Sequence, residues 1–118
     1  MDENLKTILI LDTTLFASLI IFYFIKKDEI NPIIGYRTKR AMKNIENWKF
    51  AQTFFSKNWL FSIPIVLVTQ IPLLFNKELT YLIDFSFINF VIYSVYLIII
   101  TEIKLKKFDI HNKKNNEA

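Results

Sequence analysis

Hydrophobic positions in this sequence fall into three long blocks separated by polar stretches. The blocks cover about residues 7–25, 59–75 and 81–101, and each contains at most one charged residue. A helix needs roughly 17 to 25 such residues to cross a bilayer. Runs of this length exceed ordinary strands several-fold, and a helix satisfies its own backbone hydrogen bonds inside lipid. The pattern therefore predicts an all-α integral membrane protein with three transmembrane helices.

The connection between the first two blocks has a different pattern. Apolar residues recur at helical spacings from residue 38 to 59, while polar residues such as Gln52 fall largely on the other side. Asn44 and Asn47 are candidate capping or interruption points, so one helix and two short helices both stay open. An amphipathic helix with lysines on one face and aromatic residues on the other lies in the headgroup region. We expect residues 31–58 to form an interfacial segment of this kind.

Charge adds an orientation to the three spans. The chain carries 15 Lys and Arg residues, and all but Lys6 and Lys77 lie in the first connection or after the third block. Because basic residues next to spans stay in the cytoplasm, the first connection and the C-terminus are predicted to be cytoplasmic, with the N-terminus outside. Residues 1–103 are then one membrane domain. Residues 104–118 are rich in Lys and Asn, and we expect them to be a disordered cytoplasmic tail.

Four polar residues inside the blocks are candidates for function, because burying such groups in lipid is expensive. Asp12, Gln70 and Asp84 are all predicted to lie in the outer half of the membrane, where they would be able to meet. Asn89 is five positions from Asp84, which puts the two on different helix faces, and Asp84 is close enough to the interface to reach it. One interpretation is interhelical hydrogen bonding. The other is that Asp12 binds a cationic peptide or relays a proton.

Composition argues against several classes of function. There is no cysteine, and the one histidine, His111, lies in the polar tail, so no metal site is expected. Asp12 and Asp84 are the only conceivable catalytic pair and belong to no recognisable motif, so we expect neither an enzyme nor a cofactor. The basic residues of the first connection are explained by membrane topology. We therefore expect contact with membrane lipids and no direct binding of nucleic acid.

Residues 31–51 read NPIIGYRTKRAMKNIENWKFA. This stretch resembles the signature of the SdpI family of small bacterial membrane proteins, and the order of one helix before it and two after it also fits. The matching positions are Asn31, Gly35, Tyr36, Arg37, Thr38, Asn47, Trp48 and the pair Phe50 and Ala51.

The resemblance implies a location and a function. The founding member of the family protects its producer against a secreted, membrane-active peptide toxin and holds a transcriptional repressor at the membrane. By this likeness the chain is expected in the bacterial inner membrane, as a resistance or signalling protein with a toxin, a repressor or another membrane protein as partner. The motif residues form its candidate cytoplasmic interface. Two alternatives stay open, namely a small accessory subunit of a larger membrane complex and an oligomeric carrier that uses Asp12.

Overall fold

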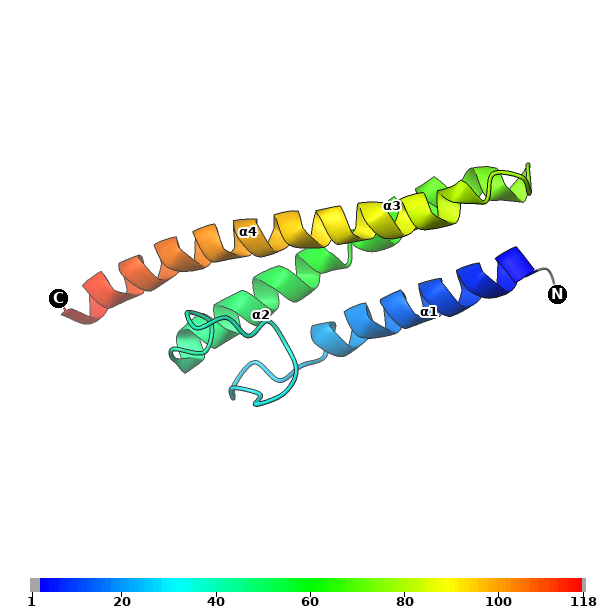
Figure 1. Cartoon of the computed structure of the whole chain (residues 1–118). Helices are drawn as coiled ribbons and strands as arrows, with labels where there is room; N and C mark the ends of the chain where they lie inside the picture. Colours follow the sequence, from blue (N-terminus) through cyan, green and yellow to red (C-terminus); the bar gives the residue numbers. More distant parts are fainter. Residues whose placement is uncertain (1–2, 118) are drawn as a thin grey trace.

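The structure is a computed structural model that describes residues 3–117; residues 1, 2 and 118 lie outside it. The described part of the chain is entirely helices and their connections. Its elements are α1 (Glu3–Tyr23), α2 (Ile45–Trp59), α3 (Ser62–Gln70), the 3-10 helix η1 (Ile71–Leu74) and α4 (Tyr81–Glu117). They form an elongated bundle of 62 × 22 × 17 Å in which α2 and α3 run antiparallel to α1 and α4 (Figure 1).

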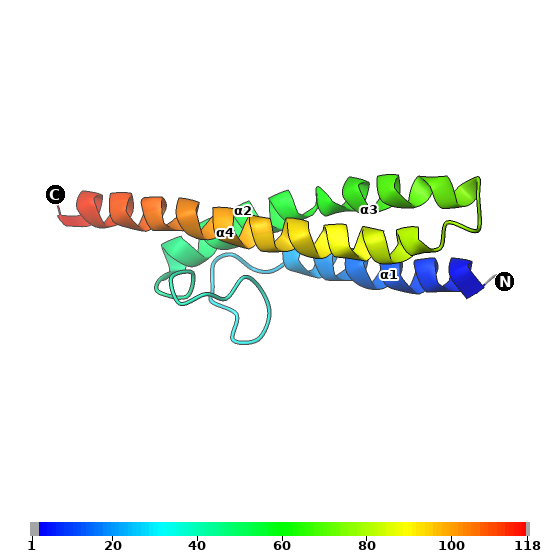
Figure 2. The same cartoon turned by 45° about the horizontal axis from the view of Figure 1, so that its top comes forward.

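The two ends of the bundle carry different parts of the chain. The start of α1 and the turn at residues 76–80 lie at one end, which we call the turn end (Figures 1 and 2). The loop between α1 and α2 and the last turns of α4 lie toward the other end. Because 11 of the 15 lysines and arginines belong to these two segments, we call it the basic end.

Three stretches of helix are long and apolar enough to span a membrane. They are α1, the run from Ile45 to Leu74, and α4. Large apolar side chains point outward along them, such as Ile10, Val68 and Ile92 at 69%, 64% and 62% exposure, which a hydrocarbon solvent favours. The prediction of an all-α membrane protein with three spanning helices is confirmed.

The second span is not one continuous α-helix. It is broken after Trp59, and the chain resumes as α3 at Ser62. Pro64 lies in the first turn of α3, where its missing N–H leaves little unsatisfied. Pro72 occupies the start of η1, where the helix tightens into 3-10 geometry instead of continuing. The two prolines therefore account for both departures from α-helical geometry.

A helix, α2, forms within the segment that was expected to be interfacial. Its first residue is Ile45, and the Asn44 side chain caps it by accepting a hydrogen bond from the backbone N–H of Asn47 at 2.7 Å. Residues 38–44 form turns, so a capping point at Asn44 is the alternative that the structure selects. α2 packs against α1 and α4 and leads directly into α3. Its placement in the headgroup region stays a prediction.

The expected disordered tail is corrected for residues 104–117, because α4 continues through them as helix. Leu105 is fully buried, and the ring of Phe108 stacks on that of Phe50 with centroids 4.6 Å apart. Lys43 also pairs with Asp109 at 3.0 Å. These contacts with α2 and the preceding loop supply the apolar burial that composition alone did not reveal. Residue 118 lies outside the described residues.

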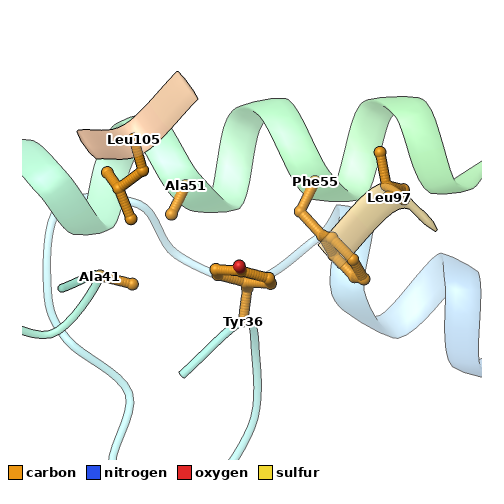
Figure 3. Packing of buried hydrophobic residues seen from close by; sticks show 6 residues of the cluster. All are labelled: Tyr36, Ala41, Ala51, Phe55, Leu97 and Leu105. Carbon is orange, nitrogen blue, oxygen red and sulfur yellow. The ribbon is translucent and has the colours of Figure 1, made fainter. Parts of the chain in front are cut away.

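Two apolar clusters hold the bundle together. The first joins α1, α3 and α4 through Leu15, Leu19, Val66 and Phe90. The second lies at the basic end, where the ring of Tyr36, from the loop, lies next to Phe55 of α2 with centroids 4.9 Å apart. Figure 3 shows the members of this second cluster, which are Tyr36, Ala41, Ala51, Phe55, Leu97 and Leu105.

Candidate functional site

The residues of the sequence motif lie in the loop between α1 and α2 and in the first two turns of α2; we call residues 31–44 the motif loop. Asn31 begins it with a side-chain turn, because its Oδ1 accepts hydrogen bonds from the backbone N–H groups of Ile33 and Ile34 at 2.8 and 2.9 Å. Its carbonyl oxygen accepts a further bond from Arg37 Nε at 3.2 Å. Asn31 thus shapes the entry to the loop.

Gly35 occupies a position that no other residue fits. Its φ of +123° lies in a region that side chains with a Cβ rarely adopt. A Cβ there would lie 2.9 Å from Gln52 Oε1 and 3.1 Å from Cη2 of Trp48. The glycine lets the loop backbone approach α2 closely enough for the next residue to bond to it.

Gln52 of α2 holds that next residue by both of its backbone groups. The Tyr36 N–H donates to Gln52 Oε1 at 2.9 Å, and Gln52 Nε2 donates back to the Tyr36 carbonyl oxygen at 2.7 Å. Gln52 is 1% exposed, so both bonds are buried. The sequence pattern placed this residue on the polar side of the helix, which is wrong. Four residues after Trp48 and three before Phe55, it shares their buried face.

Trp48 closes the loop against the end of α1. It is completely buried, and its Nε1 donates to the Lys26 carbonyl oxygen at 3.2 Å. The indole therefore covers Gly35 on one side and satisfies a backbone acceptor just past α1 on the other. This contact joins the two ends of the connection between the first and second spans.

Thr38 and Asn47 organise the second half of the motif loop. Thr38 Oγ1 accepts from the Ala41 N–H at 3.2 Å, which starts the turn that leads to α2. Asn47 is completely buried, and its Nδ2 donates to the Arg40 carbonyl oxygen at 3.0 Å. Both residues thus act on the backbone of the loop, in agreement with their small polar side chains.

α4 completes the site with Glu102, which the sequence analysis did not select. The Tyr36 hydroxyl donates to Glu102 Oε1 at 2.7 Å, and Arg40 Nη1 donates to Oε2 of the same carboxylate at 3.3 Å. The only signal in the sequence is that Glu102 is the first charge after the third hydrophobic block. Its partners lie more than 60 residues away, and nothing in a single sequence identifies them.

The motif residues therefore act mainly inside the protein, and we call the contacts that tie the motif loop to α2 and α4 the lock. The side chains of Tyr36, Asn47 and Trp48 are buried, and the loop is tied to α2 and α4 through Gln52 and Glu102. Of the seven selected motif residues, Arg37 is the one that is classed as exposed. A partner that approaches the basic end would meet Arg37 and the surrounding lysines rather than the rest of the motif.

The polar residues of the spans divide into two groups. Gln70 Nε2 donates to Asp12 Oδ1 at 2.9 Å and to the Ser86 hydroxyl at 3.1 Å, so α1, α3 and α4 meet at one buried amide. Asn89 makes a longer contact of 3.4 Å with Thr69 Oγ1. Asp84 is exposed and has no hydrogen-bond partner among the described residues. Asp12 and Gln70 are thus brought together, as expected, and Asp84 is not.

Known proteins provide a separate indication of the family to which this sequence belongs. The sequence profile of the SdpI/YfhL protein family matches residues 27–103, about two thirds of the chain. The chain belongs to this family. No curated protein and no solved structure matches it. The resemblance noted in the motif is therefore confirmed, and with it the chain's place among multi-pass membrane proteins.

The SdpI/YfhL match coincides with the locked part of the structure. It begins at Lys27, just after α1, and ends one residue beyond Glu102. The motif loop, Gln52 and Glu102 all lie within it, whereas Asp12 lies outside. In this chain the matched residues thus include the loop folded onto α2 and α4, and the polar contact of Asp12 lies outside them.

Titration of Tyr36 gives a test of the lock in this SdpI/YfhL protein. Burial, together with the hydrogen bond and negative charge of Glu102, raises the pKa of the Tyr36 hydroxyl above its usual range. The neutral hydroxyl is therefore favoured in the folded state. Its contribution to stability is fully present below about pH 10, the ordinary tyrosine pKa, and is lost as pH rises from there toward the raised value.

We expect the wild type to lose stability more steeply above about pH 10 than Tyr36→Phe does. The absorbance of tyrosinate near 295 nm, followed during alkaline titration in detergent, measures the ionisation directly. The fraction that ionises only with unfolding should shrink in Tyr36→Phe. If the fraction of tyrosine that ionises only with unfolding is the same in both proteins, Tyr36 ionises freely in the folded protein and is not held by the lock.

Proposed function

We propose that this chain is a bacterial inner-membrane protein that makes its cell resistant to a membrane-active peptide toxin. The family match over residues 27–103 carries the proposal, because it includes the whole motif loop and most of two of the three spanning stretches. Toxin immunity is what the resemblance to the founding member implies. A transcriptional repressor as a second partner is a further implication of that resemblance and stays a prediction.

The proposed orientation has the motif loop and the end of α4 in the cytoplasm and the turn end outside. It rests on the positive-inside rule applied to the 15 basic residues. The arrangement of the bundle supports it, since the two basic segments lie toward the same end and the two segments poor in Lys and Arg lie at the other (Figure 1). A toxin that arrives from outside would then meet the end that contains Asp12.

Survival of a sensitive host tests the proposal. The full chain is expressed in bacteria that are killed by secreted membrane-active peptides, and colony counts are taken across a panel of such peptides. We expect at least one peptide for which survival rises about tenfold or more over the empty vector. Membrane insertion is verified by fractionation in each case. Inserted protein without a gain against any peptide would contradict the resistance function.

A further inference from the structure

A cleft opens between α1 and the end of the second span, near the turn end. Its volume is about 550 Å³. Its walls are mostly aliphatic, and Asp12 and Gln70 bring a carboxylate and an amide into it. The lining residues from α1 are Asn4, Leu5, Ile8 and Asp12, and those from the facing segment are Leu67, Gln70, Ile71, Leu73, Leu74 and Lys77.

The Asp12 carboxylate is held in place but has spare capacity. Gln70 Nε2 donates to its Oδ1 and also to Ser86, whose hydroxyl in turn donates to the Ile83 carbonyl oxygen at 2.7 Å. This chain of bonds fixes the amide, which is 7% exposed. An ionised carboxylate accepts about four hydrogen bonds. In residues 3–117 Asp12 forms no ion pair, whereas Lys6, which precedes it by six residues, pairs with Glu3.

The shape of the cleft restricts what can reach this carboxylate. Asp12 lies eight residues after Asn4, which is about 12 Å along the helix from the turn end. It is also about five residues inside the apolar block of α1, and in the proposed orientation this depth puts it below the level of lipid headgroups. The ammonium of a phospholipid headgroup stays in the headgroup layer. A lysine or arginine carried by an apolar peptide within the bilayer has both the aliphatic stem and the terminal cation that the cleft requires.

We propose that this cleft binds a lysine or arginine side chain of a membrane-inserted peptide, with Asp12 as the charge partner and Gln70 as the residue that positions it. The aliphatic stem would pack against Ile8 and Leu73, and the cation would approach Asp12. For the biological source of the peptide, this inference rests on the proposed function. The binding itself is measurable without any toxin or any survival assay.

Energy transfer in bilayers tests the binding. The chain has no cysteine, so a donor dye is attached through a single Glu78→Cys change in the exposed turn. The probe is a hydrophobic Leu/Ala helix with one lysine about two turns from its outer end, and the matched probe has glutamine at that position. Both carry an acceptor dye and are reconstituted with the protein in phosphatidylcholine. We expect the lysine probe to associate about tenfold more strongly, the size of one charge-assisted hydrogen bond.

Two carboxylates of the spans supply matched variants. Asp12→Asn should reduce the preference for lysine to near unity, and Asp12→Glu should restore part of it. Asp84→Asn removes the same charge from an exposed position outside the cleft and should leave the tenfold preference intact. Circular dichroism establishes that each variant keeps its helix content. Equal binding of the two probes by the wild type, or an unchanged preference in Asp12→Asn, would overturn the proposal.

Gln70→Leu separates positioning from packing. The substitution keeps the volume of the side chain but frees the carboxylate to reorient, so the ratio between the two probes should fall while binding of the glutamine probe stays the same. A purely structural role of Gln70 would weaken both probes alike. Displacement of the lysine probe by added phosphatidylethanolamine would identify a lipid amine as the occupant instead of a peptide.

The survival assay tests the proposed function and the binding assay tests the cation site, so one proposal can be contradicted while the other is supported. If no peptide toxin is resisted but the lysine preference depends on Asp12, the proposed function is wrong and the cation site stands. If resistance is observed and Asp12→Asn retains it while both probes bind equally, the cleft is no part of the mechanism.

Discussion

Replacement of Gln52 by leucine is expected to lower the free energy of unfolding by about 2 to 6 kcal/mol. Leucine has nearly the same volume, so the effect comes from hydrogen bonding rather than from a cavity. The Tyr36 N–H and carbonyl would both lose their partner. Each buried backbone group left without a bond costs about 1 to 3 kcal/mol.

Unfolding in mixed micelles with increasing dodecyl sulfate, followed by far-UV circular dichroism, measures this loss. Thr53→Leu is the matched control, because Thr53 is the next residue of α2 and is exposed. The control should remain within about 0.5 kcal/mol of the wild type. If Gln52→Leu does the same, the loop is not held by this side chain in solution.

Trp48→Ala is expected to lower the free energy of unfolding by about 3 to 5 kcal/mol. The indole is completely buried, so its removal leaves a cavity between α2 and the end of α1. It also leaves the Lys26 carbonyl oxygen without its donor. Trp48→Phe retains most of the apolar burial and loses the hydrogen bond, which should cost about 1 kcal/mol for the bond itself.

The same unfolding assay, read by circular dichroism because one of the two tryptophans is removed, tests this order. Ile33→Ala serves as the control, since Ile33 lies in the motif loop but is 78% exposed. A loss for Trp48→Ala no greater than that of Ile33→Ala would mean that the indole is not packed as described. A free energy of unfolding that is lowest for Trp48→Ala, intermediate for Trp48→Phe and highest for the wild type would show that packing contributes more than the hydrogen bond.

The helical architecture was predictable because lipid leaves few options. An apolar run of bilayer length with at most one charge satisfies its backbone inside lipid as a helix, so the three blocks could be predicted without knowledge of their neighbours. The break after Trp59 was harder to predict from the sequence, because a proline such as Pro64 is compatible with the first turn of a helix and is also able to interrupt a helix. The helix beyond residue 104 was missed because Leu105 and Phe108 are isolated in a polar composition. Their burial depends on α2, which lies far away in sequence.

Only some residues of the candidate site could be predicted from the sequence. Gly35, Tyr36 and Trp48 were selected from the motif, and the structure gives each a packing role. Their partners were not found, because Gln52 was assigned to a polar face and Glu102 was not among the candidate residues. Spacing alone would have placed Gln52 with Trp48. The pairing of Tyr36 with Glu102 joins residues 66 positions apart and follows only from the fold.

This separation also sets the order of events while the protein is being made. Tyr36 is synthesised 66 residues before Glu102, and a ribosome that adds about 5 to 20 residues per second needs about 3 to 13 s for that distance. Throughout this interval α4 is incomplete, and the Tyr36 hydroxyl and Arg40 have no carboxylate to bind. A chain that stops before residue 102 keeps the contacts of the loop with Gln52 and Trp48 but lacks its tie to α4. The contacts of the loop with Glu102 therefore form only in molecules whose last helix has been made at least as far as residue 102.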